Sequence, residues 1–439
     1  MRRRGGFAVR ALGIAILGIL GIAVAAPMHA AGFSIFEQGT KAMGMGGAFT
    51  AQADDPSALF YNAGGLAFVD QQEFSLGATW IHGSKAEFEG ANPFPGEGNR
   101  AEQKKLSEFP PHAYWVRPIN NQWKVGLGLT TPFGLTTEWE NPDQFSGRFL
   151  SAKAALRAFD INPTIGWQIT PTFGIGVGAI ARVSDVELIR YAGANNPFTQ
   201  SFVSVGKLDL KADFSEGYGF NVGLLNKVNN SFSWGLSYRS QITVDYEGDA
   251  RLSQISSGNA QFDAVLRTRL PYNTKLPVKT SIDFPDEASL GLAFAITPNV
   301  LVETDANWTG WSSFEQVKID FTGGATNSLP DTTIRESWQD VYNYRLGIRW
   351  TTSPTTQWRA GYVYDETPQR EEGVSPLLPD ANRSGFSLGY GYTGGVKADL
   401  ALMYLPFEER TRSKSFPGEG PFFGTYNTTA WLLGATLTF

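Results

Sequence analysis

The sequence predicts an all-β protein, a transmembrane antiparallel β-barrel of about 14 strands with an N-terminal plug, or hatch, of short helices inside the lumen. Three observations lead to this prediction: a basic and apolar leader, a period-two alternation of apolar and polar residues, and connections that are alternately short and long. They divide the chain into a signal peptide (1–30), a plug (31–71) and a barrel (72–439).

The leader differs from the rest of the chain. Four arginines, at positions 2, 3, 4 and 10, precede a 16-residue apolar run over 11–26. A membrane-spanning helix needs about 20 residues, whereas this run suits a secretory signal peptide. An uncleaved anchor helix is the alternative. A cut after Ala30 leaves Met28 where a small residue is usual, so Ala31 is a second candidate for the cleavage position.

Composition excludes several classes of function. The leader holds four of the 36 basic residues and none of the 42 acidic ones, so 32 − 42 gives the mature part a net charge of −10. This charge argues against nucleic acid as a partner. The chain has no cysteine, and only His82 and His112 follow the leader, so we expect no metal site and no cofactor. No later apolar stretch is long enough for a helical span, while 12 tryptophans suit the aromatic girdles of a membrane barrel.

Alternation is the main secondary-structure signal. From Trp123 to Leu129 every odd position is apolar and every even one is polar or glycine, and the runs 159–169 and 231–247 repeat the pattern. Successive side chains of a strand point to opposite faces, so each run has one apolar face. A soluble sandwich would bury that face, and a membrane barrel would turn it to lipid. Stretches such as 205–225 exceed the usual 5–6 residues of a globular strand.

Fourteen stretches show this character, and the segments between them alternate in length. The expected strands are 73–82, 112–117, 122–131, 157–169, 172–184, 205–225, 231–247, 287–296, 299–308, 335–351, 356–366, 383–393, 396–406 and 428–439. Six connections are tight and polar, and the other seven are expected to be long: 84–111, 132–156, 185–204, 248–286, 309–334, 367–382 and 407–427.

Short turns on one rim and long loops on the other are typical of barrels in the outer membrane of Gram-negative cells. The even count places the short turns and the C-terminus at the periplasmic rim. Closure is required because an open sheet edge in hydrocarbon would leave backbone groups unpaired. The chain ends on Phe439, which shares a face with Trp431, Leu433 and Leu437. A terminal phenylalanine of this kind resembles the signal recognised by the barrel assembly machinery.

Residues 31–71 lack strand character and are rich in glycine and other small residues. Asp55 as N-cap with Pro56 at the first helical position predicts a short helix over 57–61, which should end at Gly64-Gly65. The segment also carries large apolar side chains that cannot stay exposed in the periplasm, among them Phe33, Ile35, Phe36, Leu59, Phe60 and Leu66. A barrel of this size has room for a plug, so we place the segment in the lumen.

Several spaced motifs resemble the FadL-type outer-membrane transporters of long-chain fatty acids, whose relatives admit aromatic hydrocarbons. The start 31–33 (AGF) and the phrase 55–66 (DPSALFYNAGGL) are similar to the mature start and the plug signature of that family. Further similar phrases, in the same order, are 160–163 (DINP), 308–314 (WTGWSSF), 359–362 (RAGY) and 378–383 (LPDANR). The likeness covers essentially the whole mature chain. Ala63 stands where the family signature has proline, so the turn after Asn62 is expected to differ in detail.

The resemblance implies a mechanism and a set of site residues. Extracellular loops would catch a ligand, an internal pocket near the start of the plug would hold it, and a lateral gap in the wall would release it without an energy source. The plug residues that would line the pocket are Phe33, Ile35 and Phe36, and those of the plug motif are Asp55, Pro56, Asn62 and Gly64. A basic motif over 181–190 matches the family strand, so Arg182 and Arg190 are candidates to meet a carboxylate.

Two features of the residues themselves support parts of this mechanism. Large apolar side chains stand in segments expected to be loops: Phe94, Phe133, Leu135, Phe145, Phe149, Phe198, Phe422 and Phe423. Together they suggest an apolar vestibule, with Phe133, Leu135 and Phe149 as ligand contacts; the alternative is that they pack beneath the loops. Several charges have lumen parity, namely Arg239, Arg345, Arg349, Arg359, Lys207, Asp209, Lys211, Asp213, Glu303, Asp305 and Asp365. Such charges commonly pair across strands.

The predicted function is passive transport of hydrophobic small molecules across the outer membrane, with long-chain fatty acids as the first candidate and aromatic hydrocarbons as the alternative. The expected partners are this ligand, outer-membrane lipid and the assembly machinery, and the barrel is expected to be a monomer. A general porin would need an open lumen. An enzyme is not expected, because His82-Gly-Ser84 is the sole His–Ser neighbour pair and no Gly-x-Ser-x-Gly elbow exists. A structural or adhesive barrel would not explain the plug.

Overall fold

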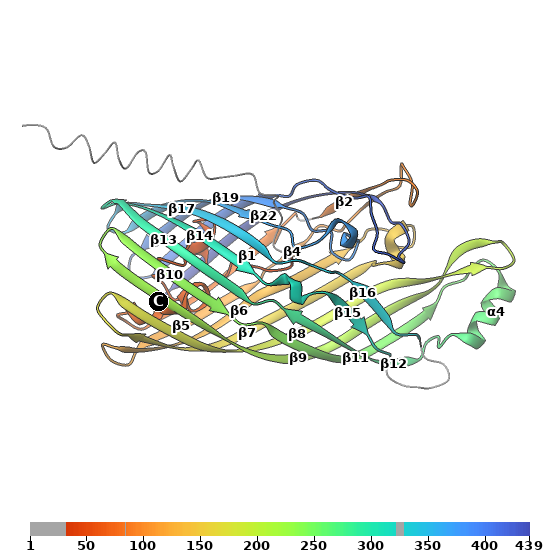
Figure 1. Ribbon diagram of the computed structural model, residues 1–439, viewed down its shortest axis with the longest axis horizontal. Helices are drawn as coiled ribbons and strands as arrows, with labels where there is room; N and C mark the ends of the chain where they lie inside the picture. The colour runs from red at the N-terminus through yellow and green to blue at the C-terminus, as the bar shows by residue number, and fades with distance from the viewer. Residues whose placement is uncertain (1–31, 84, 322–328) are drawn as a thin grey trace, which may run out of the picture.

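The computed structural model describes residues 32–83, 85–321 and 329–439. The expected signal peptide, 1–30, and the serine of the His82-Gly-Ser84 phrase lie outside the described residues. Within them, fourteen antiparallel ribbons close into a barrel, because the first strand pairs with the last, with Ser75 opposite Thr438. The predicted fold class is confirmed, and Figure 1 shows the tilted strands of the wall.

The ribbons follow one another around the wall in chain order. In that order they are β1 (Glu73–His82), β5 (Pro111–Pro118), β6 (Trp123–Glu138), β7 (Lys153–Gln168), β8 (Phe173–Asn196), β9 (Ser201–Asn229), β10 (Phe232–Arg239) continued by β11 (Ile242–Gln254), β12 (Lys275–Phe284) continued by β13 (Glu287–Thr297), β14 (Val300–Thr309), β17 (Val341–Ser353), β18 (Thr356–Asp365), β19 (Arg383–Thr393), β20 (Lys397–Pro406) and β22 (Gly424–Thr438).

Connections at the two rims differ as predicted. Turns of two to four residues lie at the rim that carries the C-terminus (Figure 1), and the elements outside the wall lie in the connections of the other rim. The latter are β2 (Ala86–Gly90), β3 (Arg100–Glu102), β4 (Ser107–Glu108), η2 (Ser146–Phe149), α4 (Ala260–Arg269), η3 (Trp311–Ser313), β15 (Gln316–Ile319), β16 (Thr332–Arg335), η4 (Glu371–Gly373) and β21 (Arg410–Arg412). No helix of the described residues is long and apolar enough to cross a bilayer.

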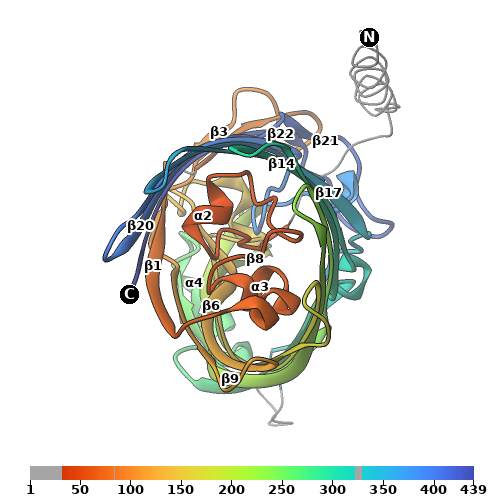
Figure 2. The same cartoon turned by 90° about the vertical axis from the view of Figure 1, so that its left-hand side faces the viewer.

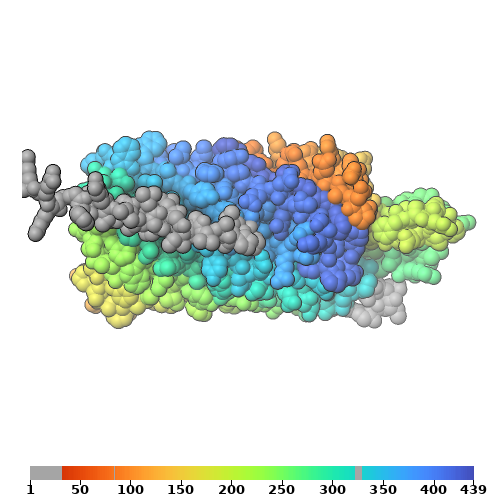
Figure 3. Space-filling model, turned by 45° about the horizontal axis from the view of Figure 1, so that its top comes forward, coloured from red at the N-terminus to blue at the C-terminus, as the bar shows by residue number. Residues whose placement is uncertain are grey.

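One expected loop is wrong. The segment 185–204 is mostly strand, because β8 and β9 continue to a four-residue turn at 197–200. The flanking strands also reach into 132–156 and 248–286. The physical reason is that the wall extends beyond the bilayer, where its apolar side chains turn inward. We call this extension of β8, β9, β11 and β12 the tower; Figure 3 shows it as the projection at one end of the molecule.

Along the ribbon formed by β10 and β11, the apolar side chains therefore change from the outer side of the wall to the inner side. On β10, Leu236 and Tyr238 face outward and are exposed, whereas on β11 Val244 and Tyr246 are buried. Our expectation that the apolar residues of 231–247 share one lipid-facing side is wrong, because the break between β10 and β11 reverses the faces. The predicted lumen charges at 207, 209, 211 and 213 also face outward, while Leu208 and Leu210 between them are buried in the tower.

The plug lies inside the barrel. Figure 2 looks along the lumen and shows α2 (Thr40–Met43) and α3 (Ala58–Tyr61) surrounded by the wall. The helix predicted over 57–61 is present, but its N-cap is Ser57 and not Asp55. Asp55 instead accepts hydrogen bonds from the backbone N–H and the hydroxyl of Ser57, at 2.8 and 2.5 Å. The helix also ends earlier than predicted, at Asn62, and 63–68 form the 3-10 helix η1.

Asn62 and Gly64 fix the plug to the wall. The Asn62 amide donates to the carbonyls of Thr50 and Leu224, at 2.7 and 2.9 Å, and its oxygen accepts from the N–H of Gly64 at 3.0 Å. A Cβ atom on Gly64 would lie 2.7 Å from the backbone nitrogen of Leu225, so only glycine allows this approach.

Two carboxylates on β14 hold the plug most directly. Asp305 Oδ2 accepts from the N–H groups of Phe49 and Thr50, at 2.9 and 3.0 Å. Glu303 accepts from the N–H of Ala51 at 2.5 Å and from the Gln52 amide at 2.8 Å. Because all of these groups are buried, each backbone donor depends on its carboxylate.

Asp305→Ala should loosen the plug without unfolding the barrel. Two hydrogen bonds to a charged group are lost, at roughly 1.5 kcal/mol or more each, so amide exchange at Phe49 and Thr50 should accelerate by about a hundred-fold. Hydrogen–deuterium exchange measures this directly. The matched control is Asn307→Ala on the same inner face, since the Asn307 amide has no hydrogen-bond partner in the described structure. Equal acceleration in both variants would contradict the anchoring role of Asp305.

Candidate functional site

Three cavities follow one another through the extracellular half of the lumen. The outermost, which we call the vestibule, has a volume of ≈ 410 Å³ and is bordered by Phe149, Arg190 and Thr332 among others. The middle one, the neck, holds ≈ 110 Å³ and shares Ile334 and Leu377 with the vestibule. The innermost, the chamber, holds ≈ 270 Å³ and shares four residues with the neck: Phe33, Leu135, Leu156 and Leu378. Apolar side chains thus connect all three.

The vestibule combines aromatic and charged side chains. Phe149, at the end of η2, packs edge-on against Phe202 at 5.1 Å. Arg190 on β8 donates to the hydroxyl of Thr332 at 3.0 Å and forms no ion pair with any described residue. Arg412, by contrast, lies 3.6 Å from Glu419. The vestibule therefore offers a guanidinium with one hydroxyl partner next to an aromatic pair.

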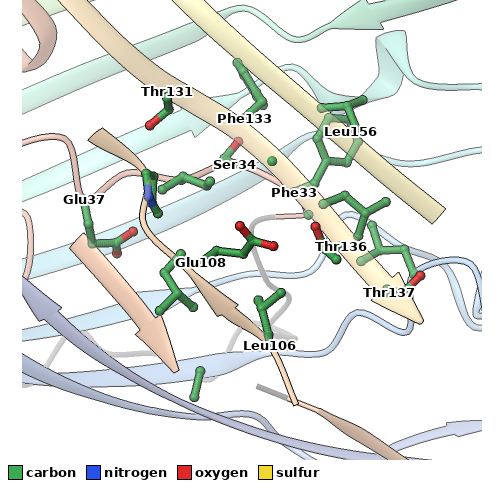
Figure 4. Close-up of a pocket in the computed structure, with 18 of the residues that line it drawn as sticks. Phe33, Ser34, Glu37, Leu106, Glu108, Thr131, Phe133, Thr136, Thr137 and Leu156 are labelled. Atoms are coloured by element: carbon green, nitrogen blue, oxygen red, sulfur yellow. The ribbon is translucent and has the colours of Figure 1, made fainter. Parts of the chain in front are cut away.

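The neck and chamber meet at the first residues of the plug. The Phe33 ring packs against five aromatic rings, with centroids 4.7 Å away at Trp311 and 5.4 Å away at Phe314. Trp338, Phe133 and Phe284 complete this aromatic cluster at 5.6, 5.9 and 6.1 Å. Figure 4 shows Phe33, Phe133 and Leu156 together on one side of the chamber. Movement of Phe33 would change the size of both cavities.

The chamber adjoins an interruption of the wall. Pairing of β5 with β6 stops at Ala113 opposite Leu129, and the register of β6 against β7 shifts between Thr130 and Phe133. Beyond this point β6 has the plug as its neighbour instead of β5. The Gln38 amide donates to the Thr131 carbonyl at 2.8 Å and accepts from its N–H at 2.9 Å.

The first plug residues continue this substitute pairing. Ile35 N–H donates to the Pro132 carbonyl at 2.8 Å, and Gly134 N–H donates to the Phe33 carbonyl at 3.0 Å. On the outer side of this interruption, the residues that line the chamber include Phe109 and Phe159. Both are exposed on the outer surface of the barrel. The chamber is therefore bounded on one side by residues that face the bilayer.

A layer of ion pairs closes the lumen below the chamber. Arg182, fully buried, forms two hydrogen bonds with Asp160, at 2.8 and 2.9 Å, and stacks on Phe133 and Phe284. Arg239 lies 3.6 Å from Asp160. Asp365 receives both Arg345 and Arg383, at 3.3 and 3.2 Å. Arg349 and Arg359 are likewise paired, with Asp54 and Asp399. The predicted inward direction of Arg182, Arg239, Arg345, Arg349 and Arg359 is confirmed, and each has an acidic partner.

A loop segment between η4 and β19 separates the cavities. The Trp139 ring nitrogen donates to the Pro376 carbonyl and Thr137 donates to the Leu377 carbonyl, both at 2.9 Å. Asp380 then accepts from the N–H of Gly32 at 3.1 Å. These bonds fix Leu377 and Leu378 at the two ends of the neck.

Several residues of this arrangement were not predictable from the sequence. Trp311, Phe314 and Leu378 stand in the family-like phrases 308–314 and 378–383, whereas no sequence feature marks Trp338 or Gln38. Of the apolar loop residues, Phe145 and Phe422 pack in a cluster with Trp139, while Phe149 borders the vestibule. Phe133 and Leu135 lie on β6 and face inward, so their expected place in a loop is wrong. Phe36 packs under the Arg345 guanidinium, 3.8 Å away, in the plug itself.

Known proteins share the sequence features and the architecture described above. A family model described as outer membrane protein transport protein (OMPP1/FadL/TodX) matches residues 21–439. The long-chain fatty acid transport protein of Escherichia coli O6:H1 is 25% identical over 436 residues, which cover 93% of this chain and 94% of that protein. The 47 kDa outer membrane protein of Pasteurella multocida is 26% identical over 430 residues, or 95% of each chain.

Solved structures share the fold. A Pseudomonas aeruginosa FadL homologue superposes with a TM-score of 0.81 at 20% identity, covering 93% of this chain and 99% of the other. The Pseudomonas putida toluene transporter TodX gives 0.70 at 17% identity, covering 94% and 98%. The protein is therefore a plugged β-barrel of the outer membrane, a transport protein and not an enzyme. It belongs to the OMPP1/FadL/TodX family of outer membrane transport proteins.

Glu336, which borders the vestibule, gives a pH-dependent prediction. Burial raises the pKa of its carboxyl to about 7, and the carboxylate accepts from the Trp338 ring nitrogen at 2.9 Å. In an unfolded chain the pKa is about 4.3. The folded state thus holds this proton more tightly, and the stability it provides is present below about pH 4 and is lost as the pH rises through about 7.

Between about pH 4 and pH 8, wild type should lose roughly 3 kcal/mol relative to Glu336→Gln, which stays neutral. Tryptophan emission during denaturant unfolding measures the difference. The exposed Glu140→Gln change should follow wild type at both pH values and serves as the control. Curves for Glu336→Gln and wild type that stay parallel across this range would refute the prediction.

Proposed function

We propose that this protein takes up hydrophobic small molecules by passive diffusion, with long-chain fatty acids as the first candidate cargo and aromatic hydrocarbons as the alternative. The ligand enters the vestibule, passes the neck, rests in the chamber beside Phe33 and leaves sideways into the membrane. The observation that supports this proposal best is the unbroken apolar contact between three cavities and the bilayer-facing Phe159. Curated relatives named for fatty acid transport and neighbours named for toluene transport agree with both cargo classes.

The direction of exit follows from energetics. A hydrophobic solute gains about 0.8 kcal/mol per CH₂ group on leaving water, so the bilayer is a better destination than the periplasm. Below the chamber, the ion-pair layer around Asp160 and Asp365 would have to be disrupted for the ligand to pass. Breaking buried pairs costs several kcal/mol each. A sideways exit next to β6 avoids this cost.

Capture depends on the vestibule. In this proposal Arg190 meets a carboxylate, because its guanidinium has one hydroxyl partner, and the ring pair of Phe149 and Phe202 meets an alkyl chain or a ring. The other candidate for a carboxylate, Arg182, is engaged by Asp160 and two aromatic rings, so we assign it to the barrel interior.

A general porin is the less favoured alternative, because the plug and the ion-pair layer occupy the described lumen. We further propose that Phe439 takes part in recognition by the assembly machinery. Its backbone pairs with Phe74 of the first strand, while the residue is 62% exposed and accessible to another protein or lipid.

Arg190→Ala should weaken binding of a fatty acid and spare an aromatic hydrocarbon. Loss of one charge-assisted hydrogen bond, about 1.5 kcal/mol, corresponds to about ten-fold weaker oleate binding. Titration calorimetry of the purified barrel with oleate and with toluene provides the comparison. Arg251→Ala, which removes an outward-facing charge from β11, is the control for net charge. An equal loss for both ligands would eliminate the charge-pairing role of Arg190.

Ala158→Trp should block the route. Ala158 on β7 is buried and lines the chamber, so an indole ring there fills the space next to Phe133. Uptake of labelled oleate into proteoliposomes should fall at least about ten-fold, because overpacking a cavity excludes its ligand. The control is Ala179→Trp, on the lipid-facing side of the neighbouring strand β8. Unchanged uptake by a correctly folded Ala158→Trp barrel argues against the chamber as the path.

A further inference from the structure

The chamber has an uneven charge lining. Two arginines and three carboxylates border it: Arg157, Arg383, Glu37, Glu108 and Asp380. Whether the chamber accepts a charged ligand depends on which of these groups already have partners within the protein, because a paired charge attracts a ligand far less than an unpaired one.

Both arginines are engaged. Arg157 forms a two-fold hydrogen bond with Asp185, at 3.0 and 2.5 Å. Arg383 donates to Asp365 at 3.2 Å and lies over the Phe407 ring. Neither arginine can bind a ligand carboxylate without breaking its ion pair with Asp185 or Asp365.

Among the three acids, only Asp380 is satisfied. Its Oδ2 atom accepts from the Gly32 N–H at 3.1 Å and from the Thr367 hydroxyl at 2.5 Å. The Glu37 carboxyl has only a hydrogen bond from its own backbone N–H, and no other described residue donates to the side chain of Glu37 or Glu108. Figure 4 shows both carboxylates at the chamber.

Glu37 is the more important of the two because it belongs to the plug and is partly buried. Burial raises the pKa of its carboxyl, and the two positive charges that oppose this effect, Arg383 and Arg345, are both paired with Asp365. Ser34, three residues earlier in the plug, lines the chamber as well, and its buried hydroxyl has no hydrogen-bond partner among the described residues. The plug thus presents an acceptor and a hydroxyl to whatever occupies this space.

We propose that the chamber selects hydrophobic molecules whose polar end is a hydrogen-bond donor, namely an alcohol, a phenol or an amine, over those that carry an ionised carboxylate, and that Glu37 is the acceptor that sets this preference. The proposal rests on the transport route above, of which the chamber is the resting site.

The physical basis is the cost of an unpaired buried charge. A ligand hydroxyl or ammonium supplies a donor that no other residue of the protein gives Glu37, and the hydrogen bond is strengthened by the charge. A ligand carboxylate would bring a second negative charge into a space without a free cation, which disfavours binding. A fatty acid would therefore keep its ionised head at Arg190 in the vestibule and enter the chamber only as the neutral acid. The two cavities would then select different forms of one cargo.

The test compares three ligands that share one alkyl chain: dodecanol, dodecylamine and dodecanoate. Binding to the full-length mature barrel in detergent is measured at about pH 8, where the carboxylate is ionised and the amine protonated. Crystals soaked with terminally brominated forms locate each ligand. Wild type should bind dodecylamine and dodecanol in the chamber at least about ten-fold more tightly than dodecanoate, as expected for one charge-assisted hydrogen bond gained or one repulsion avoided.

Glu37→Gln should reduce this difference to about three-fold or less, through weaker dodecylamine binding and tighter dodecanoate binding. Glu37→Asp keeps the charge and should keep the order of the ligands, which separates selectivity from a merely structural role. Glu140→Gln makes the same change of net charge outside the chamber and should behave as wild type.

Two contrary results are distinguishable. Dodecanoate bound in the wild-type chamber as tightly as dodecanol, with no effect of Glu37→Gln, would overturn the selectivity and leave the route intact. Bromine density in the chamber for none of the three ligands would overturn the route itself, and the selectivity with it.

Discussion

The arrangement depends on a single requirement, that no backbone group at bilayer depth remains without a hydrogen-bond partner. Where β6 separates from β5, its edge would be left open to hydrocarbon. The plug meets this requirement through the Gln38 side chain and the backbone of Phe33 and Ile35. The opening in the wall and the position of the plug are consequently one structural feature, and neither can change without the other.

This coupling also explains why the aromatic cluster sits where it does. The strand-like pairing with β6 sets the direction in which the Phe33 side chain leaves the plug, and the rings of Trp311 and Trp338 close around it. On the periplasmic side, Asp305 and Glu303 hold the other end of the plug. The plug is thus held below by two buried carboxylates with four hydrogen bonds in which its residues 49–52 donate, and above by one bond to the Asp380 carboxylate, a few neutral hydrogen bonds and ring contacts. Small movements are expected first at its upper end.

Much of the fold could be predicted because alternation and connection length are local properties of the sequence. Alternation alone does not show which face of a strand lies outside the barrel and which lies inside it. Val244 and Leu236 have the same parity in the sequence, yet one is buried in the tower and the other faces lipid. The change occurs at the break between β10 and β11. The apolar pattern of the sequence continues through this break, so it gives no sign of the change. The same limit applies to Leu208 and its charged neighbours on β9.

The site was predictable only in part, for a related reason. The candidate residues Phe33, Leu135 and Phe149 were found because large apolar side chains stood out in polar surroundings. The roles of Arg182 and Arg190 could not be distinguished, because both stand in one basic motif, 181–190, at positions of the same parity. Their difference comes from the neighbouring strand, which places Asp160 opposite Arg182, with no acid in contact with Arg190.

The tower also has a practical consequence. Its central hairpin, β8 and β9, runs well past the roughly 30 Å of the hydrocarbon layer. The turn at 197–200 closes on local bonds, from Gln200 N–H to the Asn196 carbonyl, from Phe198 N–H to the Asn196 side chain and between the hydroxyls of Thr199 and Ser201. Such exposed tips tolerate inserted sequence. An epitope or fluorophore tag placed there would label the outer end of the barrel in living bacteria without replacing any residue that lines the cavities.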